Sequence, residues 1–306
     1  MSNIRVIPRL DIKGHCVVKG IQFDGFRVLG TAEMFAEAYY ANGADEIIYQ
    51  DTVASLYQRD VDLDVVRAVA RKVAIPLTVA GGIKSTANIR SILRAGADKV
   101  AINTAAVAEP KLLRDAVKMF GSQCIVSSIE AHRRPLGKLE VWTDFGRQST
   151  GIDAFEWAKR VVDEGVGEIM LTSIDREGSG RGYDLEMISL FATALPVPII
   201  ACGGAGTVAD VVNAAKLGSA DAVSASSIFH HFYSDAQHAG VSLRGRYELR
   251  LESELDSGNV DFLQKGYGGL RDIQVTPSSI PGVKRAMREA GLSVRIEATG
   301  GEYAVS

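Results

Sequence analysis

Two short patterns occur once in each half of the chain, at matching positions. Residues 75–83 read IPLTVAGGI and residues 197–205 read VPIIACGGA. A second pair, Gly43–Ile47 and Gly165–Ile169, is spaced in the same way. Repetition at a fixed period indicates a fold built from similar units. A duplicated half-barrel of four βα units explains both pairs, and it favours a closed barrel over an open doubly wound sheet.

Short apolar runs alternate with stretches of helical periodicity along the chain. Strand–helix alternation is typical of a parallel sheet, because each helix returns the chain to the same edge. Barrels of this kind run to about 250 residues as one domain, so we expect a single (β/α)8 TIM barrel over residues 1–306. The expected strands are Arg5–Asp11, Glu46–Asp51, Leu77–Gly81, Lys99–Ile102, Cys124–Glu130, Glu168–Ser173, Val197–Ala201 and Ala222–Ala225. The expected helices include Thr31–Asn42, Val61–Val73, Thr86–Ala95, Asp153–Glu164 and a last helix, Pro281–Ala290.

Two segments interrupt this alternation. Residues 135–151 combine an alternating run with glycines at turn positions, which predicts a β-hairpin at the rim after strand five. Residues 232–279 form a polar insertion between strand eight and the last helix. Loops of that length are uncommon without a function or disorder, so a lid, a partner surface and local disorder remain alternatives.

The overall charge excludes several classes of partner. Lys and Arg number 34 against 37 Asp and Glu, giving a net charge of −3, with no like-charge run typical of nucleic-acid binding.

Cys16, Cys124 and Cys202 are far apart and lack metal-ligand spacing, so we expect reduced thiols, no metal and no cofactor. No apolar run approaches the roughly 20 residues that span a bilayer. We therefore expect a soluble, cytoplasmic protein that does not bind nucleic acid or membranes.

Paired glycines end two strands at repeat-equivalent positions. Gly81 and Gly82 are followed one strand later by Asn103 and Thr104, while Gly203 and Gly204 are followed by Ser226. Glycine lets backbone N–H groups approach an anion closely. The alternative is that the glycines only make tight turns. Two symmetric pairs favour two phosphate sites, and hence a small substrate phosphorylated at both ends.

Carboxylates form a second group at the ends of the expected strands. Asp11 and Glu130 occupy equivalent places in the two halves, so we expect them to face each other as general acid and base. Further acidic residues at the same rim are Asp51, Asp175 and Glu177, which we expect to contact the substrate. Solvated or ion-paired rim residues are the alternative. Lys19 either neutralises a phosphate or is a surface lysine.

Charged residues also open four strands at the opposite end. Arg5, Glu46, Lys99 and Glu168 would form a ring of alternating charge around the bottom of the barrel. Such a ring either stabilises the barrel or acts as a gate to its interior.

These residues resemble the family of cyclase subunits of imidazole glycerol phosphate synthase. The resemblance runs from about Met1 to Phe229 and resumes at Pro281–Glu297. It rests on Asp11–Lys13, Val18–Gly20, Gly81–Ile83, Gly96–Lys99, Ile102–Val107, Leu171–Asp175 and Gly203–Ala205. It implies a barrel that receives ammonia from a separate glutaminase docked on its N-terminal face. At the other rim, ammonia reacts with a ribulosyl aminoimidazole carboxamide nucleotide to give imidazole glycerol phosphate and an aminoimidazole carboxamide ribotide.

The resemblance also implies roles for individual residues. Asp11 and Glu130 would be catalytic, Lys19 would lie on a loop over the substrate, and Asp98 and Gln123 would lie near the glutaminase. One phosphate would be bound by Gly82, Asn103 and Thr104, the other by Gly178, Gly204 and Ser226, and the ammonia gate would be Arg5, Glu46, Lys99 and Glu168. This chain departs from the family at three positions, with Glu130 and Glu177 in place of Asp and Arg9 in place of Cys.

Three functions stay open on this basis. The first is the ammonia-dependent cyclase of histidine biosynthesis. The second is a paralogue that keeps the gate but delivers ammonia to another acceptor, such as a sugar of a surface polysaccharide. The third is a non-catalytic scaffold for the glutaminase. A related barrel isomerase of the pathway would not need the charged ring.

Overall fold

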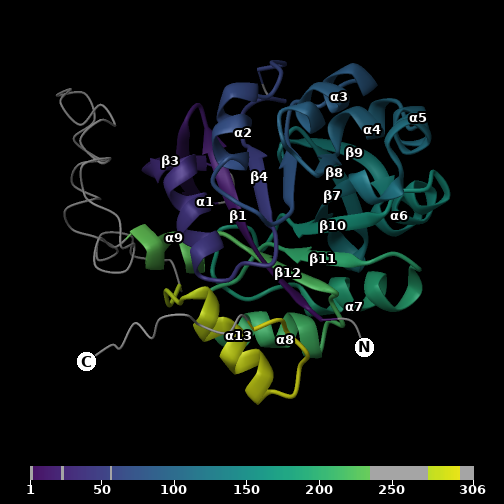
Figure 1. Cartoon of the computed structure of the whole chain (residues 1–306). Coiled ribbons are helices and arrows are strands. Elements are labelled where there is room, and N and C mark those ends of the chain that lie inside the picture. Colours follow the sequence, from purple (N-terminus) through teal and green to yellow (C-terminus); the bar gives the residue numbers. More distant parts are fainter. Residues whose placement is uncertain (1–2, 22–23, 56, 235–274, 297–306) are drawn as a thin grey trace, which may run out of the picture.

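The computed structural model describes residues 3–21, 24–55, 57–234 and 275–296. Eight parallel strands form a closed barrel surrounded by helices, which confirms the predicted fold (Figure 1). The β1–β12 and β7–β10 pairings complete the circle, with Arg5 beside Ala222 and Thr172 beside Glu130. The barrel strands are β1 (Arg5–Lys13), β4 (Ile47–Asp51), β5 (Leu77–Ala80), β6 (Lys99–Ile102), β7 (Ile125–Arg133), β10 (Glu168–Ser173), β11 (Ile199–Cys202) and β12 (Ala222–Ala225).

Local capping sets the helix limits. The Thr31 side chain accepts a hydrogen bond from the Met34 N–H, and Asp153 accepts from the backbone N–H groups of Phe155 and Glu156. Such caps satisfy N–H groups that have no partner within the helix. The helices are α1 (Ala32–Ala41), α2 (Leu63–Ala70), α3 (Thr86–Arg94), α4 (Thr104–Ala108), α5 (Lys111–Phe120), α6 (Ala154–Asp163), α7 (Leu185–Ala194), α8 (Val208–Lys216), α9 (Ser227–Ser234) and α13 (Ile280–Glu289), with 3₁₀ turns η1 (Ser122–Cys124) and η2 (Pro135–Gly137).

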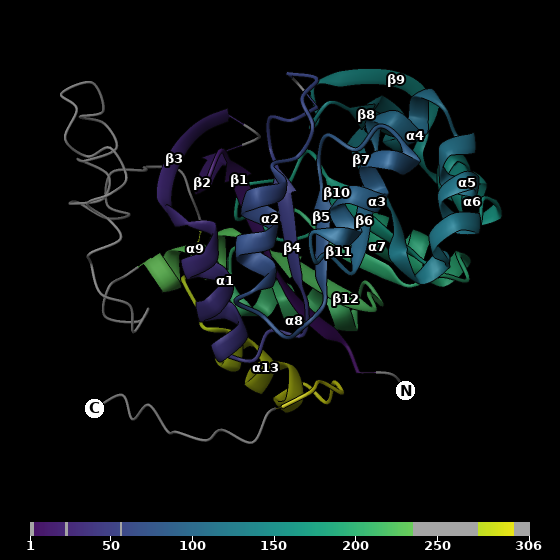
Figure 2. The same ribbon diagram turned by 45° about the horizontal axis from the view of Figure 1, so that its top comes forward.

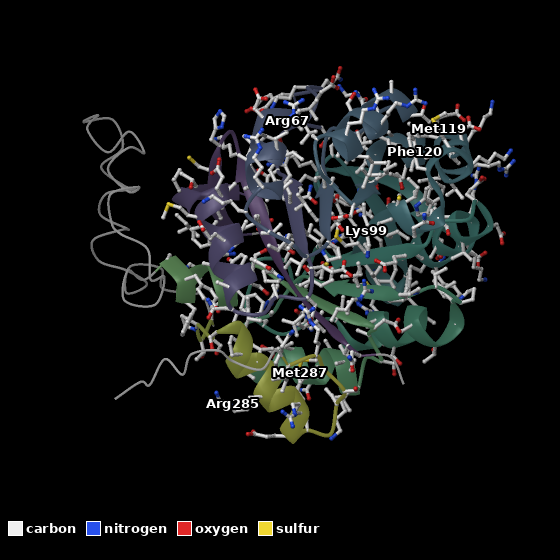
Figure 3. The ribbon with its side chains drawn as sticks, viewed as in Figure 1. Arg67, Lys99, Met119, Phe120, Arg285 and Met287 are labelled. Carbon is white, nitrogen blue, oxygen red and sulfur yellow. The ribbon has the colours of Figure 1, made fainter. Side chains whose placement is uncertain are left out.

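The core has two layers because successive side chains of a strand point to opposite faces. The outer layer packs the strands against the helices and includes the fully buried Met287 of α13. Figure 3 shows Met287 at α13 and Lys99 among the strands. The inner layer fills the barrel with Ile7, Ile48, Ala80, Ala101, Val126, Met170, Ile200, Cys202 and Ala222.

Two strands of the barrel continue beyond it into antiparallel pairs. β1 pairs with β2 (Cys16–Ile21), which pairs with β3 (Asp24–Thr31); the sequence pattern did not reveal this hairpin. β7 pairs with β8 (Leu139–Thr143), which pairs with β9 (Gln148–Asp153), within and just beyond the segment proposed as a rim hairpin. Figure 2 shows β3 and β9 at the end of the barrel away from the N-terminus.

Part of the expected insertion at 232–279 lies outside the described residues, namely 235–274. Its first residues belong to α9, and Ser279 is the N-cap of α13. Across the described ranges, no helix has the length and apolar character needed to cross a membrane.

Candidate functional site

A ring of four charged side chains closes the N-terminal end of the barrel. Nη1 of Arg5 lies 2.5 Å from Glu46 Oε1 and 2.9 Å from Glu168 Oε1. Nζ of Lys99 lies 3.0 Å from Glu46 Oε2 and 3.2 Å from Glu168 Oε2. Each cation therefore contacts both carboxylates, and the four residues predicted from the sequence do come together.

Two further residues of the predicted partner surface lie at the same end. Asp98 is exposed, and its Oδ2 accepts a hydrogen bond from the Leu77 N–H at 2.8 Å, which anchors the start of β5. Gln123 is exposed in η1, immediately before β7. Both precede barrel strands, so they border the end that carries the ring.

Arg9 lies at the opposite end of the barrel and bridges two carboxylates. Its Nε and Nη2 donate to Asp11 Oδ1 and Oδ2 at 2.8 and 3.2 Å. Its Nη2 and Nη1 donate to Glu177 Oε1 and Oε2 at 2.7 and 3.4 Å. All three side chains are buried. Bidentate guanidinium–carboxylate pairs are strong and directional, so Asp11 and Glu177 are held in fixed orientations around one cation.

Glu130 lies at the same rim, in a setting suited to proton transfer. Burial raises the pKa of its carboxyl to about 7, opposed by the Gly146 N–H and the charge of Arg9. The Gly146 N–H donates to Oε2 at 2.7 Å and comes from the loop between β8 and β9. A carboxyl group that titrates near neutral pH can both donate and accept a proton under cellular conditions.

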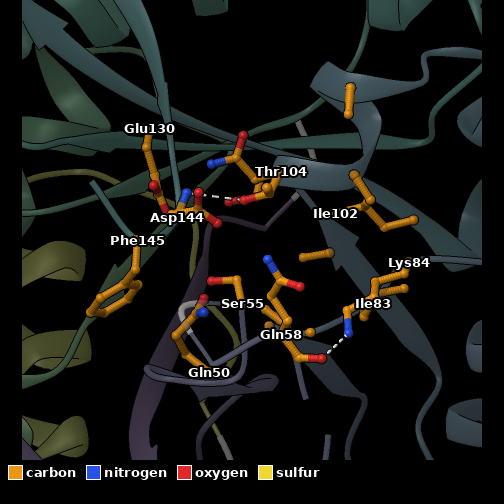
Figure 4. A pocket seen from close by; sticks show the side chains of 18 residues that line it. Gln50, Ser55, Gln58, Ile83, Lys84, Ile102, Thr104, Glu130, Asp144 and Phe145 are labelled. Atoms are coloured by element: carbon orange, nitrogen blue, oxygen red, sulfur yellow. Dashed lines mark hydrogen bonds between the residues drawn. The ribbon is translucent and has the colours of Figure 1, made fainter. Parts of the chain in front are cut away.

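The first glycine turn opens into a cavity of about 380 Å³. Gly82 has a φ of 68°, and a Cβ there would lie 2.7 Å from the Arg59 carbonyl oxygen, so only glycine fits. Asn103 Oδ1 is buried without a hydrogen-bond partner, while Thr104 Oγ1 accepts from the Asp144 N–H at 3.0 Å (Figure 4). Glu130 lines the same cavity. The turn, the amide and the carboxyl group thus share one space.

The second glycine turn borders a much smaller cavity, of about 10 Å³. It is lined by Arg9, Glu177, Gly178, Gly204 and Ser226, among others. Ser226 Oγ is buried without a hydrogen-bond partner, and Ser226 immediately precedes α9. The second set of predicted phosphate residues therefore gathers around the Arg9–Glu177 pair.

Three other predicted residues lie at the same end of the barrel but line neither cavity. Asp51 accepts hydrogen bonds from the Val53 and Ala54 N–H groups and pairs with Arg59 at 2.8 Å, so it orders its own loop. Asp175 accepts from the Arg133 N–H at 2.8 Å, at the rim between β7 and β10. Lys19 of β2 is 5% exposed, and burial lowers the pKa of its ammonium group against the opposing charges of Glu177 and Asp11.

Several lining residues were not predicted from the sequence. Lys84, Asp144 and Phe145 line the first cavity, together with Gln50 (Figure 4). Lys84 follows the glycine turn by two residues, and this closeness in the sequence was the one sign that it would line the cavity. Asp144 and Phe145 enter from the β8–β9 turn, where both have positive φ angles of 52° and 57°. Within the described part of the chain, no three His, Cys, Asp or Glu side chains cluster as metal ligands.

Fold and site together define a class: (β/α)8 barrels with a charged ring at one end and carboxylates between two glycine turns at the other. The family model described as histidine biosynthesis protein matches residues 5–234. A Legionella pneumophila protein named imidazole glycerol phosphate synthase subunit HisF is 52% identical over 206 residues, covering 67% of this chain and 97% of that protein. The chain belongs to the HisF family of histidine-biosynthesis proteins.

Proposed function

We propose that this chain is the cyclase subunit of a glutamine amidotransferase of histidine biosynthesis. A separate glutaminase docks on the N-terminal face, and ammonia passes through the barrel. At the other rim it reacts with a ribulosyl aminoimidazole carboxamide nucleotide phosphorylated at both ends, giving imidazole glycerol phosphate. The observation that carries the proposal is the pairing of Arg5 and Lys99 with both Glu46 and Glu168, at the end of the barrel opposite Asp11 and Glu130.

The side chains that separate the two ends have the character that passage of neutral ammonia requires. The inner layer of the barrel is apolar and includes the small residues Ala80, Ala101 and Ala222. Thr78 Oγ1 lies buried in β5 without a hydrogen-bond partner. Burial of a charge in such surroundings is costly, so the interior admits ammonia and excludes ammonium.

The two carboxyl groups of the rim divide the proton transfers. Attack by ammonia on the substrate generates a positively charged nitrogen, which must lose a proton, and the leaving group must gain one. Glu130, with its pKa near 7 because of burial, is suited to donate and recover a proton. Asp11 is held in a fixed orientation by Arg9 at the same rim, and it is the group that would accept a proton from the attacking nitrogen.

The phosphates of the substrate would anchor its two ends. One end is bound by Gly82, Asn103 and Thr104 in the larger cavity. The other is bound by Gly178, Gly204 and Ser226. Asn103 Oδ1 and Ser226 Oγ are both buried and have no hydrogen-bond partner in the described residues, which supports a polar ligand at these two positions.

A second candidate function is supported by the Arg9 bridge. A buried cation between Asp11 and Glu177 changes the charge at the rim, which favours a paralogue that transfers ammonia to a different acceptor, such as a sugar. A scaffold without catalysis explains the ring but gives no reason for a buried Glu130 that titrates near 7.

Complementation separates these functions. The gene is expressed in a histidine auxotroph that lacks the cyclase, and the purified chain is assayed with ammonium and the nucleotide substrate. Growth without histidine and ammonia-dependent product formation are expected. If the chain supports neither growth nor product formation but still stimulates glutaminase turnover, the paralogue is favoured. If it stimulates the glutaminase even after Asp11 and Glu130 are both replaced, and no acceptor is consumed, the scaffold is favoured.

A further inference from the structure

The two edges of the Arg9 guanidinium serve different partners. The edge formed by Nε and Nη2 faces Asp11, and the edge formed by Nη1 and Nη2 faces Glu177. Loss of Glu177 would therefore leave the Arg9–Asp11 pair intact through Nε. The second edge of the guanidinium is the part that can exchange one anion for another.

Glu177 lies between Arg9 and the second glycine turn. A Cβ added to Gly203 would lie 3.3 Å from Glu177 Oε2, which shows that the carboxylate rests against the turn. The space left beside it is about 10 Å³. That volume is about enough for one water molecule. A phosphate group has five heavy atoms, so it either stays at the open mouth of this space or displaces one of the lining side chains.

Glu177 is the residue placed to move. Arg9 lies within β1, which is paired on both sides by β12 and β4. Glu177 lies in the connection between β10 and α7, where Gly178, Gly180 and Gly182 have positive φ angles of 68°, 67° and 83°. A glycine-rich connection adjusts its backbone at lower cost than a strand in the centre of a sheet.

We propose that Glu177 is an internal substitute for a phosphate, and that a phosphate monoester displaces it from Arg9. Arg9 then donates Nη1 and Nη2 to the phosphate, while Nε keeps its hydrogen bond to Asp11. Ser226 Oγ and the backbone at Gly204 complete the site. Before binding, Glu177 neutralises a buried guanidinium that would otherwise lack one partner. The inference rests on the proposed phosphorylated substrate, but its test requires no turnover.

Binding of inorganic phosphate, measured by titration calorimetry, tests the exchange. Ser226→Ala identifies which of the two binding events belongs to the second turn. Glu177→Gln removes the competing charge and should tighten phosphate binding at that turn by about tenfold, because the binding-competent state becomes more populated. Arg9→Met should weaken it by about tenfold or more. Glu186→Gln, which removes an exposed carboxylate paired with Arg133, is the matched control and should change nothing.

Weaker or unchanged phosphate binding in Glu177→Gln would overturn the proposal, since a direct or purely structural role predicts that result. If Arg9→Met does not fold, a crystal structure of the unmodified chain with phosphate decides. Phosphate at the second turn should contact Arg9 Nη1 and Nη2, with Glu177 displaced and the Arg9–Asp11 contact retained. Phosphate bound beside an intact Arg9–Glu177 pair would refute the exchange. Neither result depends on whether the cyclase assay succeeds.

Discussion

Arg9 and Asp11 lie two residues apart on β1 and form a buried bidentate pair, with N–O distances of 2.8 and 3.2 Å. The spacing places both side chains on the same face of the strand, inside the barrel. The carboxylate of Asp11 is therefore oriented by its own strand rather than by a neighbouring loop. A catalytic group held in this way needs little rearrangement when a substrate arrives.

Replacement of Asp11 tests its proposed role. Asp11→Asn should reduce ammonia-dependent turnover by at least about 100-fold, because the amide does not accept a proton from the attacking nitrogen. The chain should still fold, with a loss of roughly 1–3 kcal/mol, since Arg9 retains Glu177 as its partner. Turnover and thermal unfolding are measured together. Asp64→Asn, at an exposed pair with Arg67, is the control, and full activity of Asp11→Asn would exclude the role.

The pH dependence of stability should report on Glu130. Its folded pKa of about 7 lies above the ordinary value of 4.5. The stabilisation from the neutral carboxyl is therefore complete below about pH 4.5 and is lost as the pH rises through 7. Glu130→Gln should abolish this loss, which is roughly 3 kcal/mol. The free energy of unfolding is measured with denaturant at pH 5 and pH 8, with the exposed Glu156→Gln as control. An equal pH dependence in Glu130→Gln and Glu156→Gln would contradict the assignment.

The same carboxyl group should shape the pH profile of catalysis. Turnover with ammonium as nitrogen source should change around pH 7 in the unmodified chain, because Glu130 gains or loses its proton there. Free ammonia must be held constant across the series so that its own ionisation does not contribute. Glu130→Asp, which keeps a carboxyl group but withdraws it by about one methylene, should lower turnover yet retain an ionisation. Persistence of the same profile in Glu130→Gln would assign it to another group.

Gly204 should tolerate no side chain. Its φ is 107°, and a Cβ would clash with the backbone of Gly182. Gly204→Ala should destabilise the fold by roughly 2–4 kcal/mol and raise the KM for a phosphorylated substrate, through strain plus displacement of the turn. Gly43→Ala is the matched control, since Gly43 has a φ of 78° with nothing within 4 Å of the added Cβ. It should cost roughly 1–2 kcal/mol, because the left-handed backbone conformation is strained for a residue with a Cβ. An equal cost at both positions would show that the contact with Gly182 does not matter.

Lys99 should matter for delivery of ammonia more than for its use. Lys99→Met leaves Glu46 and Glu168 with Arg5 alone. Turnover that depends on glutamine and the glutaminase should fall by about tenfold or more, while turnover with added ammonium should fall far less. The two rates are compared in one preparation with the glutaminase bound. An equal loss in both assays would place the effect in the fold rather than in transfer.

The sequence predicted the barrel because its signals were local and repeated. Thr31 and Asn42, predicted as the limits of a helix, are the N-cap and C-cap of α1, and Asp153 and Glu164 have the same places at α6. β1 and β7 run longer than predicted because each continues into an antiparallel hairpin. The antiparallel pairing of β1 with β2 depends on contacts between the two strands. The alternation of apolar and polar residues within one segment does not specify which strand it will pair with.

The chemistry of the rim was predictable only in part. Asp11, Glu130 and the two glycine turns follow from strand ends that must meet at one edge of a parallel barrel. The bridge from Arg9 to Glu177 joins residues far apart in the sequence, and no spacing announces it. Asp51 was expected to face the substrate, yet its carboxylate is held by Val53, Ala54 and Arg59 of its own loop. The assigned roles of these residues stay predictions until the variants are measured.

The ring at the N-terminal end is redundant in its connections, since each glutamate has both Arg5 and Lys99 as partners. If Lys99 moved away, two contacts would break, but both glutamates would still be paired with Arg5. A point-like ammonium on a flexible stem is the easier of the two cations to swing aside. A protein bound at that face would thus need to move only one side chain to open the N-terminal end of the barrel, and the ion pairs of Arg5 would stay in place.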